Sequence, residues 1–312
     1  SIFDMLPDVD NPTPLVRLHR LVPAESYSLF AKLEWMNPFG SVKDRAAWFM
    51  LKDMEQRGIL TKERGFVEPS SGNTGLSMAG MASARGYGAR VGVPDQVPLE
   101  KKVLLKIVGA ELDVMNDTVC PAPGMGDGSI NMAKSHVRSQ PNKYAMPNQY
   151  ENEQNVQAHY QTTGPEIWKQ TEGKITHLFV SLGTCGTVTR TAKFLKEKRK
   201  DIKVIAVQPS EGHDIPGLRN VSQLDVSKLF DRSLIDEILE IDYEIAYRRV
   251  LDLARSEGLL AGPSSALIFE GARRTIEKNP EGLGVMIFPD NLFKYVSHMV
   301  KHMPELAEGT RA

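Results

Sequence analysis

The side chain of this sequence that is best suited to take part in a reaction is the amine of Lys43. It lies in the segment Asn37–Arg45, where a turn containing Gly40 leads into an amphipathic stretch. An amine at the edge of a buried pocket can lose its proton and condense with an aldehyde. Most lysines are solvated surface charges, so Lys43 alone indicates no reaction. Three polar segments further along the chain supply its chemical context.

The first of these segments is a glycine-containing turn between an apolar strand-like run and a helix-like stretch. It consists of Gly183, Thr184, Cys185, Gly186 and Thr187. Glycines let the backbone turn sharply, so that successive N–H groups point into one concavity to which the helix dipole adds positive charge. This pattern suits a phosphate dianion, although an ordinary strand-to-helix turn has the same residues. It is neither a P-loop nor a Gly-x-Gly-x-x-Gly dinucleotide fingerprint.

The other two polar segments also lie where helices begin. The turn at residues 70–75, Ser-Ser-Gly-Asn-Thr-Gly, offers hydroxyls and N–H groups that suit a carboxylate at a helix N-terminus. The same residue types are favoured as helix caps without any function. Ser264, in the segment Gly262–Ser265, can cap its helix, face a ligand, or do both.

Together, and in their order along the chain, the four segments resemble the cysteine synthase and cystathionine β-synthase family of pyridoxal-phosphate (PLP) enzymes. The resemblance runs from about Asn11 to about Asp290, nearly the whole chain. It implies an α/β fold of PLP fold type II, similar to the tryptophan synthase β-subunit, with two three-layer α/β/α domains and mostly parallel sheets. A larger PLP-binding domain would combine residues 1–47 and 151–312. A smaller substrate-loop domain, residues 48–150, would be inserted in it, with the active site in the cleft between them.

The resemblance also implies roles for individual residues. Lys43 would hold the PLP cofactor and act as the catalytic base, while Asn73 would hydrogen-bond the phenolic oxygen of the cofactor. The cofactor phosphate would lie on Gly183, Thr184, Cys185, Gly186 and Thr187. The substrate carboxylate would be bound by Ser70, Ser71, Thr74 and Gln149. The family usually has glycine at the position of Cys185 and more often threonine at that of Ser70.

Ser264 matches the family serine that faces the pyridine nitrogen of the cofactor. A neutral hydroxyl does not hold this nitrogen protonated, whereas a carboxylate would. The cofactor is then a weaker electron sink, which favours loss of a β-leaving group over racemisation or transamination. Whether Ser264 or Ser265 points inward stays open at this level.

The implied activity is cysteine synthesis by β-replacement on an O-activated L-serine, either O-acetylserine or O-phosphoserine, with a sulfur nucleophile. The run Leu218–Asn220 resembles the phosphoserine-using members, and the guanidinium of Arg219 would suit a phosphate dianion. A solvated loop arginine explains Arg219 equally well. Alternatives are a cystathionine β-synthase or diaminopropionate-type synthase, a serine/threonine dehydratase, and a non-catalytic amino-acid binder.

The amino-acid composition argues against nucleic acid and membranes as binding partners. The 312 residues suit two domains, and the 38 basic and 39 acidic residues leave no field that would attract nucleic acid or an anionic membrane. No apolar run approaches the roughly 20 residues that span a bilayer. Cys120 and Cys185 form neither a disulfide framework nor a metal motif, and Ser1–Asp4 lacks signal-peptide features. Composition therefore predicts a cytoplasmic protein with no metal site. Together with this prediction, the resemblance implies a homodimer that acts on an amino-acid substrate and a sulfur donor.

The order of elements follows from hydrophobic periodicity. Apolar runs predict strands at residues 29–34, 65–67, 89–93, 111–115, 143–146, 177–182, 203–207 and 284–288. Helical periodicity predicts helices over 43–56, 99–108, 151–169, 187–199, 243–257 and 264–276. This alternation is typical of parallel sheets with helices on both faces. The segment Gly124–Gly128 is interpreted as a loop.

Overall fold

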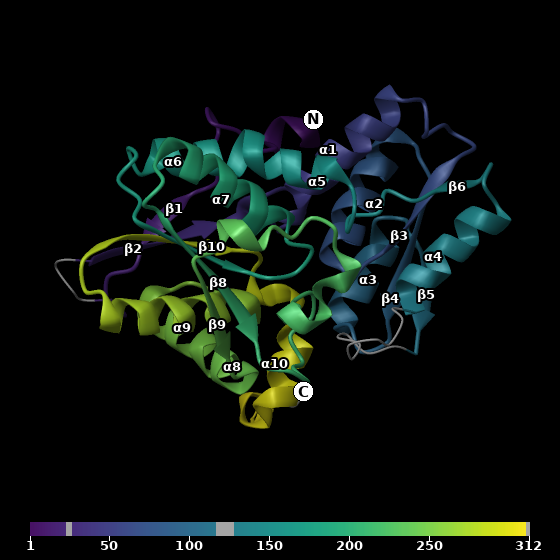
Figure 1. The fold of residues 1–312 in the computed structure, drawn as a ribbon. Helices are drawn as coiled ribbons and strands as arrows, with labels where there is room; N and C mark the ends of the chain where they lie inside the picture. The colour runs from purple at the N-terminus through teal and green to yellow at the C-terminus, as the bar shows by residue number, and fades with distance from the viewer. Residues whose placement is uncertain (23–26, 117–127, 310–312) are drawn as a thin grey trace.

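The computed structural model describes residues 1–22, 27–116 and 128–309. Two sheets with helices packed on them lie side by side, one built from both ends of the chain and the other from the segment between them (Figure 1). Cys120 and residues 124–127 of the predicted loop lie outside the described residues. None of the helices in the described ranges combines the length and the apolar character needed to cross a bilayer.

The larger sheet has six strands. Their spatial order is β1 (Leu15–Arg17), β2 (Tyr27–Leu33), β10 (Gly282–Phe288), β7 (His177–Ser181), β8 (Lys203–Pro209) and β9 (Glu237–Ile241). Only β1 runs antiparallel to its neighbour. Two of these strands, β1 and β9, are absent from the sequence prediction. β1 has three residues, and β9 reads Glu-Ile-Leu-Glu-Ile, which presents no continuous apolar run.

The smaller sheet is parallel throughout. Its order is β5 (Glu111–Met115), β4 (Ala89–Pro94), β3 (Gly65–Pro69) and β6 (Tyr144–Ala145). Phe66 and Val67, adjacent in β3, belong to different hydrophobic clusters, because successive side chains of a strand point to opposite faces. The prediction of mostly parallel sheets with both faces covered is confirmed.

Ten α-helices are found in the described part of the chain. They are α1 (Lys43–Gln56), α2 (Asn73–Arg85), α3 (Leu99–Ile107), α4 (Gly128–Ser139), α5 (Glu153–Ala158), α6 (Gly164–Gln170), α7 (Gly186–Lys198), α8 (Tyr243–Asp252), α9 (Pro263–Lys278) and α10 (Val296–His302). The helix predicted over residues 151–169 is divided into α5 and α6 by a π-helical turn at residues 159–163. A second π-helical turn, residues 253–257, ends the helix that begins with α8. The short α10 and the largely polar α4 are not predicted.

Helices cover both faces of the larger sheet (Figure 1). In β8, Ile205 and Val207 pack into the cluster that holds α8 and α9, while Val204 and Ala206 pack into the cluster that holds α7. The smaller sheet carries α1, α2 and α3 on one side and α4 on the other. Each sheet is thus the middle of three layers, and the strand ends of the two sheets face a common region.

Helix α1 belongs to both halves of the molecule. Its apolar side chains Ala46, Met50 and Met54 join the cluster that includes Phe66 of the smaller sheet. Its first residue, Lys43, follows a segment that is bonded to the end of β10 through the Val42 N–H and the Pro289 carbonyl, 2.8 Å apart. The predicted boundary between residues 47 and 48 falls inside this helix and stays a prediction.

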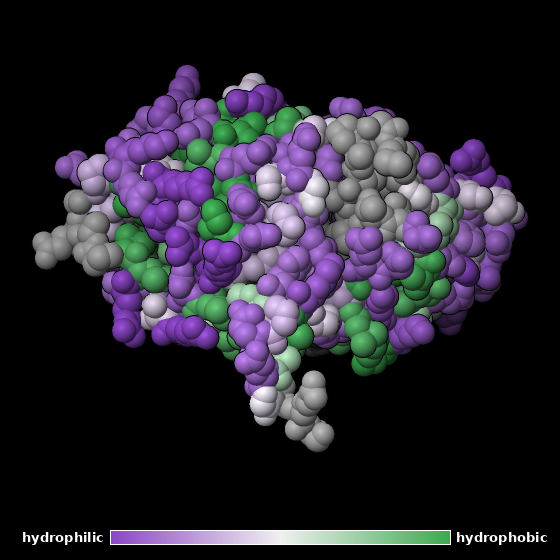
Figure 2. Space-filling model, turned by 90° about the horizontal axis from the view of Figure 1, so that it is seen from below, coloured by the Kyte–Doolittle hydropathy of each residue, from purple (hydrophilic) through white to green (hydrophobic). Residues whose placement is uncertain are grey.

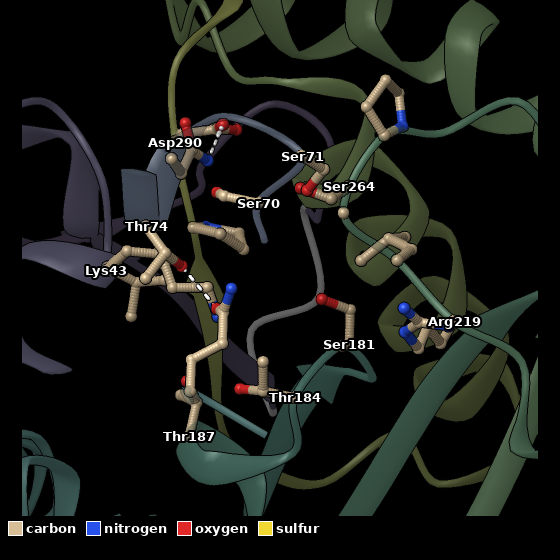
Figure 3. A pocket seen from close by; sticks show the side chains of 18 of the residues that line it. Lys43, Ser70, Ser71, Thr74, Ser181, Thr184, Thr187, Arg219, Ser264 and Asp290 are labelled. Carbon is tan, nitrogen blue, oxygen red and sulfur yellow. Dashed lines mark hydrogen bonds between the residues drawn. The ribbon is translucent and has the colours of Figure 1, made fainter. Parts of the chain in front are cut away.

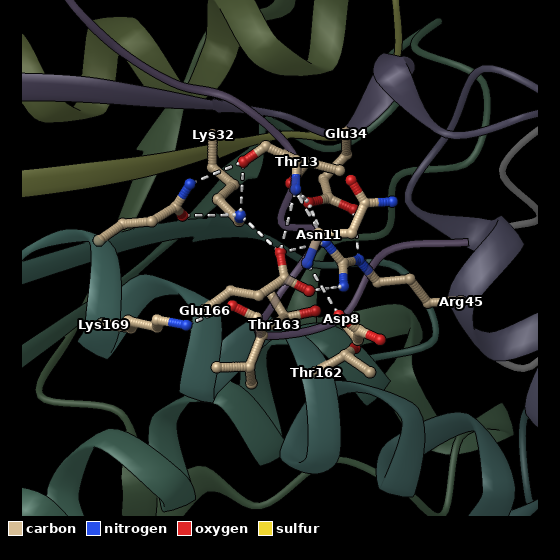
Figure 4. A network of polar contacts seen from close by, with 12 residues as sticks. Asp8, Asn11, Thr13, Lys32, Glu34, Arg45, Thr162, Thr163, Glu166 and Lys169 are labelled. Carbon is tan, nitrogen blue, oxygen red and sulfur yellow. Dashed lines mark hydrogen bonds and ion pairs between the residues drawn. The ribbon is translucent and has the colours of Figure 1, made fainter. Parts of the chain in front are cut away.

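A buried ionic cluster fixes α1 to the larger half (Figure 4). Arg45 donates to Glu34 through Nε (2.7 Å) and Nη2 (2.9 Å), and to both carboxylate oxygens of Glu166. Lys32 Nζ lies 2.6 Å from Glu166 Oε2, and the four charged side chains are inaccessible to solvent. Burial by itself would lower the pKa of Arg45, but the two carboxylates outweigh it and raise the pKa further above its usual value. Two cations and two anions therefore compensate one another in the interior.

We expect Arg45→Met to destabilise the protein by about 3–5 kcal/mol, because it leaves two buried carboxylates with only the Lys32 amine as a counter-charge. Urea unfolding followed by tryptophan fluorescence measures this loss. The matched control is Arg57→Ala at the end of the same helix, since Arg57 is 65% exposed and pairs with Asp53 at the surface. The control should change stability by less than about 1 kcal/mol. Equal effects of the two substitutions would contradict this account of the cluster.

Candidate functional site

A pocket of about 1050 Å³, counted with the part open to solvent, lies where strands of both sheets end (Figure 3). It is formed at the carboxyl ends of β3, β7 and β10, the usual position of a ligand site in parallel α/β sheets. Every predicted site residue except Gly186 lines it. These residues are Lys43, Ser70, Ser71, Asn73, Thr74, Gln149, Gly183, Thr184, Cys185, Thr187, Arg219 and Ser264.

Lys43 is the first residue of α1, and its side chain reaches into the pocket (Figure 3). Burial lowers the pKa of its amine, which makes the neutral form more accessible. Among the described residues, the backbone N–H of Lys43 donates to Ser41 Oγ at 3.2 Å, whereas no hydrogen bond or ion pair involves its Nζ. The neighbouring Asp44 holds the preceding turn by accepting from the Phe39 N–H at 2.6 Å and from Ser77. Lys43 therefore combines a fixed backbone with an amine available for reaction.

The turn after β7 presents its backbone at the N-terminus of α7. The Ser227 hydroxyl donates to the Thr184 carbonyl at 2.7 Å, and Asn155 Nδ2 donates to the Thr184 hydroxyl at 3.1 Å. Thr187 Oγ1 lies 3.1 Å from Nε2 of His159. Burial lowers the pKa of His159 to about 3, so that this imidazole is neutral and can exchange a hydrogen bond with Thr187 without adding charge.

Cys185 occupies a backbone conformation that usually requires glycine. Its φ is +66°, in the left-handed region, which explains why glycine is the usual residue at this point of the family motif. Its side chain is buried in the cluster that contains Leu182 and Val188. Burial raises the pKa of the thiol to about 12, so Cys185 is a neutral apolar filler rather than a nucleophile.

The loop after β3 is organised by its own side chains. Ser70 Oγ accepts from the N–H groups of Gly72 (3.0 Å) and Gly75 (2.9 Å), which fixes the turn that starts α2. Thr74 Oγ1 donates to Gln149 Oε1 at 2.6 Å, while Gln149 Nε2 donates to the Pro69 carbonyl at 2.8 Å. The predicted carboxylate-binding residues are thus brought together, with Ser70 already engaged in holding the loop.

Glu68 is a structural support that the sequence analysis missed. Its carboxyl group accepts from the N–H groups of Asn148 (2.8 Å) and Gln149 (3.0 Å), and so holds Gln149 against the loop. Burial raises its pKa to about 8 in spite of these bonds. The acidic residue directly before the Pro69–Ser70 step is its only signal in the sequence, and a surface glutamate would look the same.

The structure distinguishes the two serines at the start of α9. Ser264 lines the pocket, whereas Ser265 is fully buried and its hydroxyl donates to the Asp290 carbonyl at 3.4 Å. Ser264 is thus the serine available to a ligand.

Arg219 reaches the same pocket from the loop after β8, and its Nη2 donates to the Tyr150 hydroxyl at 3.2 Å. It is only 7% exposed, so the solvated-loop interpretation of Arg219 does not hold.

These residues fit PLP. A free amine, an anion-binding turn at a helix N-terminus and a neutral hydroxyl at a second helix N-terminus line one pocket. In addition, the buried donor Asn155 supports the turn rather than occupying its concavity. The fold and the site together define an α/β protein in which a buried lysine and a turn suited to an anion share a cleft between two mostly parallel sheets.

Comparison with known proteins gives the family. The family model described as "Pyridoxal-phosphate dependent enzyme" matches residues 6–290, and the chain belongs to this family. "Cysteine synthase B" of Salmonella typhimurium is 38% identical over 297 residues, covering 95% of this chain and 96% of the relative. "Probable cysteine synthase" of Bacillus subtilis is 39% identical over 301 residues, covering 93% of this chain and 95% of the relative.

Solved structures agree with the fold. O-ureido-L-serine synthase superposes with a TM-score of 0.86 at 30% identity, covering 96% of this chain and 95% of the other. The hydrogen sulfide-producing enzyme of Fusobacterium nucleatum gives a TM-score of 0.84 at 30% identity, covering 95% and 99%. The family, PLP fold type II and the PLP cofactor expected from the sequence are thereby confirmed.

Gly186 does not line the pocket, but its lack of a side chain is required behind it. A Cβ at this position would lie 2.3 Å from Oδ1 of Asn155, whose amide holds both Thr184 and the Gln149 carbonyl. We expect Gly186→Ala to weaken PLP binding about tenfold or more, a cost of about 1.4 kcal/mol per factor of ten. Titration of the cofactor-free protein with PLP, followed by visible absorbance, measures this change.

The matched control is Gly88→Ala, because a Cβ at Gly88 has no neighbour nearer than 4.0 Å. This variant should bind PLP as the parent does. Unchanged PLP affinity in Gly186→Ala would mean that the turn at residues 183–187 is not the phosphate site.

Proposed function

We propose that this chain is a cysteine synthase, which forms L-cysteine by β-replacement on an O-activated L-serine with a sulfur nucleophile. The observation that carries the proposal is the meeting of Lys43, the turn 183–187 and the turn 70–75 in one pocket. Supporting it, the curated relatives above are cysteine synthases that match nearly the whole chain.

Lys43 has two tasks in this proposal. Bound PLP supplies an electron sink for the pair left when the Cα–H bond of the substrate breaks. Lys43 would hold the cofactor in the resting enzyme and, once displaced by the substrate amine, take the Cα proton on Nζ. Its lowered pKa suits this task, because a base must be unprotonated to accept a proton.

The turn 70–75 and Gln149 would fix the substrate carboxylate. This turn forms the N-terminus of α2, an end at which helical N–H groups lack intrahelical partners, and Ser71 and Thr74 line the pocket beside it. The residues that hold the carboxylate and those that hold the cofactor phosphate would together orient the Cα–H bond toward Lys43. Asn73 would contact the phenolic oxygen of the cofactor, and Ser264 its pyridine nitrogen.

Related β-replacements are the nearest alternatives. The structural relatives include an O-ureido-L-serine synthase and a hydrogen sulfide-producing enzyme, so the same fold serves more than one reaction. Incubation with O-acetylserine or O-phosphoserine, plus sulfide or homocysteine, separates cysteine from cystathionine as the product. A dehydratase would instead release pyruvate and ammonia from serine alone.

Lys43→Ala should abolish both turnover and the visible cofactor band, while leaving the far-ultraviolet circular dichroism unchanged. The physical reason is that the lost amine serves the reaction rather than the packing of the fold. Lys52→Ala, an exposed lysine on the same helix, is the control and should behave as the parent. Normal cysteine formation by Lys43→Ala would refute the assignment.

The preferred leaving group depends on Arg219. Its guanidinium lies in the pocket wall beside Tyr150, and a planar fork of donors suits a phosphate dianion better than an uncharged acetyl ester. We propose that O-phosphoserine is at least as good a donor as O-acetylserine.

Arg219→Ala should lower kcat/KM for O-phosphoserine by about a hundredfold, a loss of about 3 kcal/mol, and should change the value for O-acetylserine by less than threefold. Steady-state kinetics with both donors and sulfide test this. Equal losses with the two donors would sink the assignment, as would a parent enzyme inactive with O-phosphoserine.

We propose further that the chain forms a homodimer through an apolar surface on α3 and its neighbour α10. Leu99, Val103 and Ile107 recur every four residues on α3 and are 64%, 45% and 73% exposed, and Val296 of α10 is 52% exposed. Hydrophobic patches interrupt the hydrophilic surface on the side viewed in Figure 2.

The cytoplasmic location of the protein stays a prediction.

Ile107→Glu should convert the dimer to a 34.7 kDa monomer, because a buried carboxylate is costly at an apolar contact. Light scattering after gel filtration measures the mass. A parent protein that is already monomeric would exclude the dimer.

A further inference from the structure

A chain of buried polar contacts ends at the cofactor pocket. Asp290, just after β10, accepts at Oδ2 from the Tyr295 hydroxyl (2.6 Å) and from Asn73 Nδ2 (2.7 Å). The Tyr295 hydroxyl accepts in turn from Lys101 Nζ at 2.8 Å. Asp290, Tyr295 and Lys101 are 0%, 1% and 2% exposed, and Asp290 and Tyr295 line the pocket. The contacts therefore join α3 and α2 of the smaller half to the end of the larger sheet.

The backbone around Asp290 connects the other two cofactor-contacting segments. The Val42 N–H donates to the Pro289 carbonyl at 2.8 Å, and Ser41 bridges to Asp290, just before Lys43. The Gly262 N–H donates to the Asp290 carbonyl at 3.1 Å, just before Ser264. One residue thus contacts the segments that carry Lys43, Asn73 and Ser264.

The amide of Asn73 is held at both ends. Its Nδ2 faces Asp290, and its Oδ1 lies 3.4 Å from Nζ of Lys294. Lys294 also donates to the carbonyls of Phe39 (2.8 Å) and Gly40 (2.9 Å), in the turn before Lys43. A carboxylate can only accept, so the Asn73 amide keeps a single orientation.

Burying the polar groups of Asp290, Tyr295 and Lys101 costs desolvation free energy. Asp290 is a buried carboxylate whose Oδ1 has no hydrogen-bond partner among the described residues. Its cationic neighbour Lys101 is also buried, and burial lowers the pKa of that amine to about 8. Packed apolar side chains of similar volume would be at least as stabilising as such a set of buried charges. A polar group kept under these conditions points to function.

We propose that Asp290, supported by Tyr295 and Lys101, is a positioning residue of the cofactor site. It fixes the Asn73 amide relative to Lys43 and Ser264, so that the second hydrogen of Nδ2, which Asp290 does not accept, would be the donor to the phenolic oxygen of the cofactor. The inference rests on the proposed contact between Asn73 and the cofactor. Its consequence is that the ionisation of the bound cofactor depends on Tyr295 and Lys101, which come from opposite halves of the molecule.

Tyr295→Phe and Lys101→Met test this inference, because each removes one polar group and keeps most of the packing volume. Lys102→Met is the matched control, since Lys102 is the next residue of α3 and its Nζ donates to the Asp95 carbonyl instead of to Tyr295. The holoenzymes are compared, without substrate, by the wavelength of the visible band, the pH at which it titrates and the PLP dissociation constant. Thermal unfolding gives the stability of each variant.

In both test variants, we expect the titration pH of the band to shift by about half a unit or more, and kcat to fall about tenfold with a donor KM within about twofold. Lys102→Met should match the parent in every measurement. Parent-like spectra and kcat in both test variants would overturn the proposal, as would activity losses that only follow the loss of folded protein. A visible band that survives in Lys43→Ala would instead show that the cofactor site itself is misplaced.

Discussion

The ionic cluster around Arg45 is the constraint on which the active-site geometry depends. Arg45 stands two residues after Lys43, and its guanidinium is held by Glu34 and Glu166 from two other elements of the larger half. The same helix packs its apolar side chains against the smaller sheet. A reactive lysine at its first residue is therefore fixed with respect to both halves. A purely apolar contact could stabilise the helix equally well, but it would set its rotation less strictly, because directional bonds restrict orientation more than packing does.

The remaining site residues are placed by strand ends. β3, β7 and β10 each run toward the same cleft, and each is followed by a polar turn or segment that meets a helix N-terminus or the Lys43 segment. Parallel sheets bring their carboxyl ends to one edge, and helix N-termini carry unpaired N–H groups. In the proposed function, the cofactor phosphate and the substrate carboxylate would therefore be bound mainly by neutral donors. Burial lowers the pKa of Lys43, while the nearby Cys185 and Asp290 act in the opposite direction without cancelling this effect.

Two other titratable side chains at or beside the pocket, those of His159 and Cys185, are neutral. His159 is buried beside Thr187 as a neutral imidazole, and Cys185 is a neutral thiol, so in the proposed reaction Lys43 would remain the base. The left-handed conformation of Cys185 costs backbone strain, of order 1 kcal/mol or more. Burial of its side chain in the cluster with Leu182 and Val188 offsets part of that cost.

The sequence by itself determined the motifs, their order and most of the elements. Glycines, helix caps and apolar periods are local properties, so the turn 183–187, the turn 70–75 and helix α1 could be predicted from neighbouring residues alone. The predicted helix boundaries were wrong where the sequence carries no local signal. An example is the π-helical turn of residues 159–163, which divides the helix predicted over residues 151–169. The strand β9 was missed because its burial comes from pairing with β8 rather than from a long apolar run.

Only the tertiary structure decided which polar side chains meet. Asp290, Tyr295, Lys101 and Glu68 carry no distinctive spacing, and their contacts join positions far apart in the chain, such as Lys101 with Tyr295. The choice between Ser264 and Ser265, and the burial of Arg219 in the pocket wall, likewise depend on the packing of whole helices and loops. Burial and hydrogen-bond partners are properties of three-dimensional neighbours. The sequence alone therefore identifies the candidate reactive groups, but not the buried charged residues, such as Asp290 and Lys101, that hold them in place.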